Sequence, residues 1–92
     1  VMTVRPGFGG QKYIQTMEPK IAEVRKMISA SNLDDKVNLE VDGGISVDTV
    51  SGAAKSGANV LIAGSALFRD PKGLTNAVTQ IRAAATQAFA SR

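Results

Sequence analysis

The apolar positions of the chain fall into two patterns, short runs typical of strands and longer stripes at helical spacing. The short runs lie at residues 1–4, 37–41 and 59–63, and the middle one alternates with polar residues. Each is followed by a stretch in which apolar residues recur at steps of three or four. These stripes consist of Met17, Ile21, Val24 and Ile28; of Val47, Val50 and Ala54; and of Leu74, Val78, Ile81, Ala85 and Ala88. The pattern predicts three strand–helix units in succession.

Capping residues predict where the helices begin and end. Thr16 is a suitable N-cap for the first helix, and Pro19 is tolerated in its first turn. Ser46 can cap the second helix, and Ser56-Gly57 ends it. Asp70-Pro71 is a typical N-cap and first-turn pair for the last helix.

Alternating strands and helices place the chain in the α/β class with parallel strands. Three such units form an open layer or an arc of a (β/α)8 barrel, because a whole barrel needs about 200 residues or more. The sequence marks no internal domain boundary, so residues 1–92 are expected to form one unit. The chain opens on an apolar run without an initiator methionine, from which we expect further sequence upstream.

Composition argues against several classes of function. The chain contains no cysteine and no histidine, which excludes a disulfide framework, a thiolate site and the commonest general base from this stretch. The net charge is +3, but the basic residues are dispersed and aromatic residues are few. This pattern argues against nucleic-acid binding. No apolar run approaches the roughly 20 residues of a membrane span, so no membrane partner is expected.

Each predicted strand ends in a loop that contains glycine: Gly7-Phe8-Gly9-Gly10, Gly43-Gly44 and Gly64-Ser65. The carboxyl ends of parallel strands form the functional face of such folds. Glycines at this face let backbone N–H groups approach an anion closely. One such loop would favour an ordinary turn between strand and helix. Glycine-containing loops after three successive strands instead predict phosphate binding.

Asp42 is the carboxylate that stands directly at a strand end beside such a loop. It could act as an acid/base or hold a metal ion, or it could cap its own loop as an Asx-turn residue, and the spacing favours neither. Glu40 lies on the same face of this strand as Asp42 and is expected to make a structural polar contact. Met2 is typical of core packing. Arg5 and Lys12 could each contact a phosphate, although a surface charge is the expected role.

Three segments together resemble the ribulose-phosphate 3-epimerase family. Residues 1–12, VMTVRPGFGGQK, are similar to that family's VMTV-x-PGFGGQ stretch. Residues 40–45, EVDGGI, are similar to its EVDGG segment, and residues 57–66 to its GA-(D/N)…GSA strand. The order and intervals agree over nearly the whole chain. The resemblance implies that residues 1–92 are the C-terminal part of a ribulose-phosphate-binding TIM (β/α)8 barrel, its last three βα units with parallel strands.

The resemblance also implies an isomerase of the pentose phosphate or Calvin pathway. Its small-molecule substrates would be the sugar phosphates D-ribulose 5-phosphate and D-xylulose 5-phosphate, interconverted by metal-assisted proton transfer at C3 between two aspartates. Asp42 matches one of those aspartates, which is both the catalytic acid/base and a metal ligand. The implied cofactor is a divalent metal ion, zinc, with iron, manganese or cobalt as alternatives. The positions that match the family's substrate and phosphate loops are Met2, Gly7, Phe8, Gly9, Gly10, Gly43, Gly44, Gly64 and Ser65.

The chain departs from the family because it lacks the histidines of the metal site. The other metal ligands and the second catalytic aspartate are therefore expected outside this chain, and the fragment alone is expected to be inactive. Two alternatives stay open: another ketose-phosphate 3-epimerase, such as one acting on allulose 6-phosphate, and a non-catalytic phosphate-binding module. The expected location is cytoplasmic, with a plastid location and a homo-oligomeric full-length enzyme left open.

Overall fold

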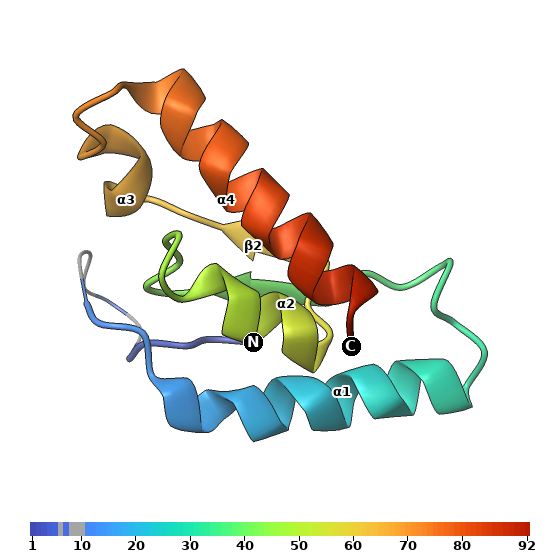
Figure 1. Cartoon of the computed structure of the whole chain (residues 1–92). Helices are drawn as coiled ribbons and strands as arrows, with labels where there is room; N and C mark the ends of the chain where they lie inside the picture. The colour runs from blue at the N-terminus through green and yellow to red at the C-terminus, as the bar shows by residue number, and fades with distance from the viewer. Residues whose placement is uncertain (6, 8–10) are drawn as a thin grey trace.

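The computed structural model describes residues 1–5, 7 and 11–92, which fold into an α/β arrangement (Figure 1). Two short strands lie between helices, in the alternating order that the apolar pattern predicts. The elements are the 3-10 turn η1 (Gln15–Met17), α1 (Glu18–Ala30), β1 (Glu40–Asp42), α2 (Val50–Ser56), β2 (Val60–Ile62), α3 (Ser65–Phe68) and α4 (Leu74–Ala90).

The two strands are parallel, with Val41 opposite Leu61. The N-terminal segment lies beside β1 through one isolated parallel bridge between Met2 and Asp42. Two backbone hydrogen bonds hold it there: Thr3 N–H donates to the Asp42 carbonyl at 2.9 Å, and Asp42 N–H donates to the Val1 carbonyl at 3.0 Å. The parallel sheet is therefore confirmed for two strands. The predicted strand over residues 1–4 is corrected to a bridge, because its pairing does not extend beyond this short contact.

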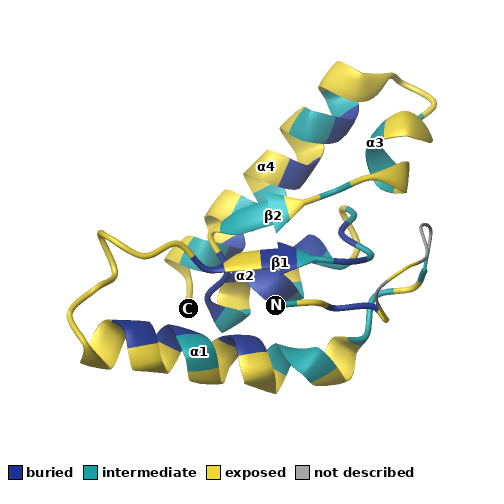
Figure 2. Cartoon of the chain, turned by 180° about the vertical axis from the view of Figure 1, so that it is seen from behind, coloured by how far each residue is buried: buried dark blue, intermediate teal, exposed yellow. Residues whose placement is uncertain are grey.

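The helices cover one face of the strands. Helix α2 contacts both α1 and α4, and Figure 1 shows it in front of the sheet between them. Val41 points into this layer and is fully buried, together with Ile21 of α1 and Val50 of α2. Figure 2 shows the two strands from the other side, where exposed and half-buried residues appear. Glu40 is exposed on this face, as expected from the alternation along the strand.

The first helix begins later than the sequence predicts. Thr16 lies inside η1, and the N-cap of α1 is Met17, whose side chain makes no capping hydrogen bond. Pro19 does occupy the first turn, where the missing N–H removes no helical hydrogen bond. The prediction of Thr16 as the N-cap is wrong because a 3-10 turn precedes the helix.

The second helix also begins late. The Ser46 hydroxyl accepts a hydrogen bond from the Asp48 N–H at 3.2 Å, and the Thr49 hydroxyl donates to the Gly44 carbonyl at 2.7 Å. These bonds form a turn before the helix, so α2 begins at Val50 and Val47 is half exposed instead of buried. The predicted end is confirmed, since α2 stops at Ser56 before Gly57.

The last helix begins at Leu74, after Gly73 in a positive-φ conformation. The Asp70 carboxylate accepts a hydrogen bond from the Lys72 N–H at 2.7 Å and another from the Asn76 side chain at 3.0 Å. Asp70 therefore caps the turn before α4, and the prediction that it is the helix N-cap is wrong. The amphipathic stripe holds from Ala77 onward, while Leu74 stays half exposed.

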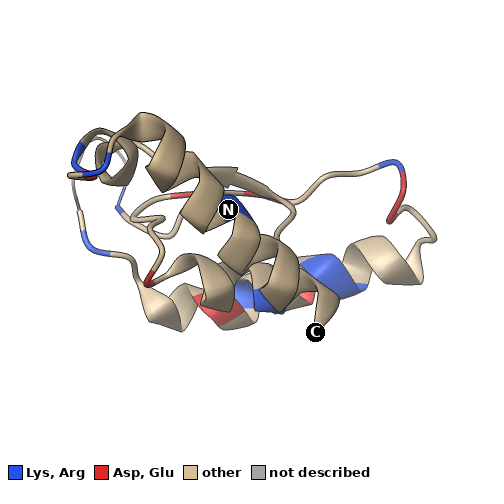
Figure 3. Cartoon of the chain, turned by 45° about the horizontal axis from the view of Figure 1, so that its top comes forward, with Lys and Arg blue, Asp and Glu red and all other residues tan. Residues whose placement is uncertain are grey.

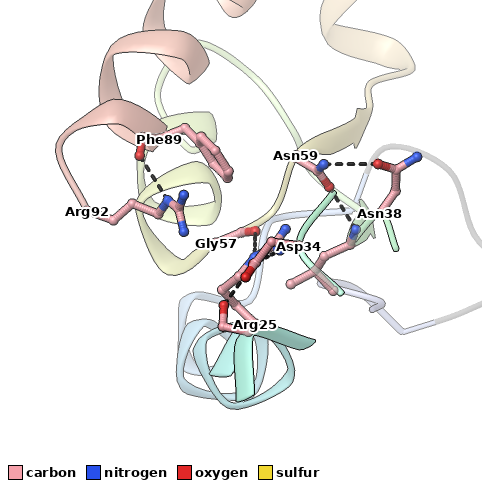
Figure 4. A network of polar contacts seen from close by, with 9 residues as sticks. Arg25, Asp34, Asn38, Gly57, Asn59, Phe89 and Arg92 are labelled. Carbon is pink, nitrogen blue, oxygen red and sulfur yellow. Dashed lines mark hydrogen bonds and ion pairs between the residues drawn. The ribbon is translucent and has the colours of Figure 1, made fainter. Parts of the chain in front are cut away.

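At the end of the sheet where the strands begin, a polar network ties α1 to two neighbouring loops (Figure 4). Arg25, only 7 % exposed, donates to the Gly57 carbonyl at 2.8 Å and pairs with Asp34 at 2.9 Å. Ser29 donates to the same Asp34 oxygen at 2.7 Å. The Arg25 guanidinium also lies 5.9 Å from the centre of the Phe89 ring of α4, within cation–π range. These contacts join α1, the 31–39 loop, the α2–β2 turn and α4.

Over the part of the chain that the structure describes, no helix combines the length and the apolar character needed to cross a membrane.

Candidate functional site

A cleft of about 700 Å³ lies where the strands end. Its walls come from the N-terminal segment, the β1–α2 loop and the β2–α3 junction. Parallel strands all point their carboxyl ends to the same edge, so residues far apart in sequence meet there. The residues that line it include Met2, Val4, Arg5, Gly7, Lys12, Tyr13, Asp42, Gly43, Gly44, Asp48, Thr49, Gly64, Ser65 and Arg69.

Seven of the predicted site residues line this one cleft: Met2, Gly7, Asp42, Gly43, Gly44, Gly64 and Ser65. The remaining three, Phe8, Gly9 and Gly10, lie outside the described residues. Met2 is 38 % exposed, so it is not the buried core residue that its apolar character first suggested. The structure thus brings the described candidates together.

Asp42 ends β1 and faces the cleft with a half-buried side chain. Its backbone is held by the N-terminal segment on one side and by β2 on the other, which fixes its position in the sheet. Among the described residues, its carboxylate makes no hydrogen bond and no ion pair. A carboxylate acting as an Asx-turn cap would accept a backbone N–H of its own loop. The described contacts therefore favour a carboxylate that is available to a ligand.

The turn that follows Asp42 requires its two glycines. Gly43 and Gly44 have φ angles of 134° and 68°, in the region that side chains disfavour. A methyl group on Gly43 would lie 2.6 Å from the Val4 side chain, and one on Gly44 would lie 2.5 Å from the Tyr13 backbone nitrogen. The Thr3 hydroxyl, fully buried, donates to the Gly43 carbonyl at 2.5 Å. This turn is packed tightly against the N-terminal segment.

Gly64 is different from the glycines of that turn. A methyl group built on it meets no described atom within 4 Å, and its φ angle of −118° is accessible to any residue. Neither a positive φ nor packing against described atoms therefore requires glycine at this position. A close approach of the backbone to a ligand is one physical reason for a glycine beside the cleft.

The charges around the cleft favour an anion. Arg5, Lys12 and Arg69 line it from three separate segments, against the carboxylates Asp42 and Asp48. Figure 3 shows Lys and Arg segments beside the short helix α3, and others along α1 and on the opposite loop. Arg5 and Lys12 are exposed, as predicted for surface charges, but the surface they occupy is the rim of the cleft. A cluster of positive charges at a concave site raises the local concentration of anionic ligands.

The sequence reading missed Tyr13 and Arg69. Tyr13 is half-buried at the cleft, and its hydroxyl donates to the Glu18 carboxylate at 2.9 Å. Burial, and then the hydrogen bond to Glu18, raise the pKa of Tyr13 well above its ordinary value, so the phenol keeps its proton. Arg69 stands four residues after Ser65, one helical turn along, and this spacing was the available signal for it.

The described residues do not by themselves make a site for a divalent cation. No group of three or more Asp, Glu, Cys or His side chains comes together among them. Asp42 offers one carboxylate, whereas zinc in catalytic sites takes about three protein ligands. The donor set in this part of the chain is therefore incomplete for a metal ion.

Comparison with known proteins gives a consistent set of relatives. The model of the "Ribulose-phosphate 3 epimerase family" matches residues 1–68. The ribulose-phosphate 3-epimerase of Methanocaldococcus jannaschii is 47% identical over 89 residues, which cover 97% of this chain and 37% of that protein. That of Bacillus subtilis is 47% identical over 68 residues, covering 74% of this chain and 31% of the relative. That of Serratia marcescens is 46% identical over 71 residues, covering 77% and 33%. The chain spans about a third of the length of the curated relatives it matches.

Proposed function

The chain belongs to the ribulose-phosphate 3-epimerase family, and we propose that it supplies the phosphate-binding loops and one acid/base of such an enzyme. The substrates are D-ribulose 5-phosphate and D-xylulose 5-phosphate, and the reaction inverts the configuration at C3. One observation carries the proposal: the half-buried Asp42 carboxylate, without a described partner, shares a cleft with glycine-containing loops from separate strand ends.

The loops are suited to the phosphate group. Ser65 opens the short helix α3 directly after Gly64, and the Gly43-Gly44 turn lines the same cleft. Backbone N–H groups in such loops hold phosphate without needing a charged side chain. The basic residues of the rim, Arg69 and Lys12, add attraction for a doubly charged group. The phosphate thereby anchors one end of the sugar and leaves C3 to be placed near Asp42.

Asp42 performs proton transfer at C3. As a carboxylate it takes the C3 proton of one epimer, and the electron pair of the C–H bond moves to the neighbouring carbonyl oxygen to give an enediolate. In the opposite direction the protonated Asp42 returns a proton to C3, and the carbonyl re-forms. Inversion requires a second acid/base on the other face of the sugar, which we place outside this chain.

The proposal includes a divalent metal ion, zinc, held partly by this chain and partly by residues outside it. Asp42 would provide one oxygen ligand, and the ion, when bound, would offset the negative charge of the enediolate oxygen. The other ligands are assigned to sequence outside this chain, since the described residues supply no further cluster.

The described segment corresponds, in this proposal, to an arc of a (β/α)8 barrel. Its parallel strands, its helices on one face and its cleft at the strand ends support that assignment. The open face of the sheet, which carries Glu40 and Asp42, would then line the barrel interior. The cytoplasmic location and the oligomeric state stay predictions.

The proposal is tested by turnover of the full-length protein that contains this chain. With ribulose 5-phosphate in deuterated water, we expect xylulose 5-phosphate to form and deuterium to appear at C3. Free ribulose, which lacks the phosphate, is the control and should react far more slowly. Equal rates with both sugars would contradict phosphate anchoring, and absence of C3 exchange would contradict the acid/base role.

A further inference from the structure

Tyr13 connects the cleft to the start of helix α1. Its side chain lines the cleft, and its hydroxyl donates to Glu18 Oε2 at 2.9 Å. The next residue, Ile14, donates its N–H to the Thr3 carbonyl at 2.7 Å. Tyr13 is thus held from its side chain by α1 and from its neighbouring backbone by the segment beside β1.

The backbone of Tyr13 is packed against the turn that follows Asp42. A methyl group on Gly44 would lie 2.5 Å from Tyr13 N, 2.7 Å from its Cα and 2.9 Å from its Cβ. Gly44 and Tyr13 therefore touch directly, without an intervening side chain. A displacement of Tyr13 would change the room available to this turn at the wall of the cleft.

The Glu18 carboxylate is in turn packed against helix α2. A methyl group on Gly52 would collide with Glu18 Oε2, the oxygen that accepts the Tyr13 hydrogen bond. Gly52 belongs to the helix that the β1–α2 loop leads into. The carboxylate consequently sits between Tyr13 and α2, with its position limited from both sides.

We propose that Tyr13 and Glu18 are positioning residues that hold the Gly43-Gly44 turn in the shape required to bind the phosphate. They act through the turn and do not touch the reacting atoms. The inference rests on the proposed function, because it assigns the cleft to a sugar phosphate. It adds a hydrogen bond that links α1 to the wall of the cleft. The glycine-containing loops alone do not provide this link.

The test measures the dissociation constant for inorganic phosphate, and KM and kcat for ribulose 5-phosphate, in the full-length protein. Tyr13→Phe removes the donor, Glu18→Leu removes the acceptor, and Glu18→Gln keeps an acceptor oxygen without the charge. Loss of one hydrogen bond predicts about 3- to 10-fold weaker phosphate binding and a matching rise in KM, with kcat nearly unchanged. Because both residues form one contact, the Tyr13→Phe/Glu18→Leu double variant should bind no more weakly than either single variant.

Glu18→Gln should bind phosphate as the parent does, and Glu23→Gln on the exposed side of α1 is the matched control for loss of a carboxylate. Parent-like affinity of folded Tyr13→Phe would overturn the inference. So would Glu18→Gln binding as weakly as Glu18→Leu, or additive losses in the double variant. If the parent binds phosphate and epimerises the sugar, these failures leave the proposed function standing. A parent that binds no phosphate would overturn both.

Discussion

The two ends of the small parallel sheet differ in how their polar side chains are paired. At the end where the strands begin, Arg25 donates to Asp34 and to the Gly57 carbonyl (Figure 4), and Ser29 donates to Asp34. The buried Arg25 Nη2 has no partner among the described residues. At the end where the strands finish, the Asp42 carboxylate has no described partner and basic side chains surround an open cleft. The same alternation of strands and helices therefore produces one end held by polar contacts and one end whose carboxylate stays unpaired among the described residues.

Under the proposed function, this difference places stability and function on separate surfaces. A buried polar group costs stability unless it is paired, and three hydrogen bonds hold the polar groups at the Arg25 end. A ligand-binding group must keep some of its bonding capacity for the ligand, so the Asp42 end cannot be paired in the same way. Substitution of Arg25 should lower the free energy of unfolding and spare activity, whereas substitution of Asp42 should lower activity and leave the free energy of unfolding unchanged.

The largest expected effect comes from producing the 92 residues alone. The outer edge of β2 is unpaired among the described residues, and Ile62 and Phe68 are exposed, which invites association. The described residues also lack a complete metal-ligand group. We expect no epimerase activity with added zinc, and self-association by light scattering. A monomeric, cooperatively folding and active chain would contradict the barrel-arc assignment.

Next in size is Asp42→Asn in the full-length protein. The amide keeps the shape of the side chain but cannot exchange the C3 proton, so kcat should fall by at least ~100-fold. Asp48→Asn, at another carboxylate of the same cleft, is the control and should retain most of the activity. Unfolding in urea should be unchanged for both variants. An active Asp42→Asn variant would remove this residue from the mechanism.

At the opposite end, Arg25→Met should lower the free energy of unfolding by about 1.5–3 kcal/mol, the range for a hydrogen bond to a charged group. The change removes the bonds to Gly57 and Asp34 and keeps an apolar stem of similar length. Lys26→Met, on the exposed neighbour, should change stability little. Urea denaturation measures both. If kcat/KM of folded Arg25→Met fell as steeply as stability, the separation of the two ends would be wrong.

A smaller effect is expected from Gly64→Ala. The added methyl group meets no described atom, so stability should hold, while phosphate binding should weaken about tenfold, or about 1.4 kcal/mol. Gly44→Ala should instead lower stability, because the methyl group would press on the Tyr13 backbone. Calorimetric titration with phosphate, with thermal unfolding as the second measurement, distinguishes the two. An unchanged affinity for phosphate in Gly64→Ala would show that this glycine serves only the turn.

The smallest effect concerns pH at the Arg25 end. The hydrogen bond from Ser29, and then the bond and charge of Arg25, hold the pKa of Asp34 below its ordinary value of 3.8. A depressed folded-state pKa stabilises the fold above the unfolded value, and this contribution is lost as pH falls through the folded pKa. The difference in melting temperature between the parent and Asp34→Asn should therefore be present at neutral pH and shrink below about pH 4. Asp35→Asn is the control, and a difference that persisted in acid would rule out the ionised carboxylate as its cause.

Local pattern was sufficient for much of this molecule. The order of the units, the parallel pair, the end of α2 before Gly57 and the gathering of Asp42 with the strand-end glycines were all predicted from residue spacing. These features depend on periodicity and on backbone preferences that act within a few residues. The starts of the helices were predicted poorly, because Ser46 and Asp70 cap turns as readily as they cap helices.

Other features were decided by the tertiary structure alone. The N-terminal segment pairs with β1 only near Met2, and Tyr13 becomes part of the cleft through contacts with Gly44 and Glu18. Arg25 is charged, yet it is buried, and the Gly57 carbonyl, 32 residues away, accepts its hydrogen bond. Sequence determined the elements and their order, since those follow from short-range preferences. Which polar side chains are paired and which stay available to a ligand was decided by packing between distant segments, whose contacts no local pattern encodes.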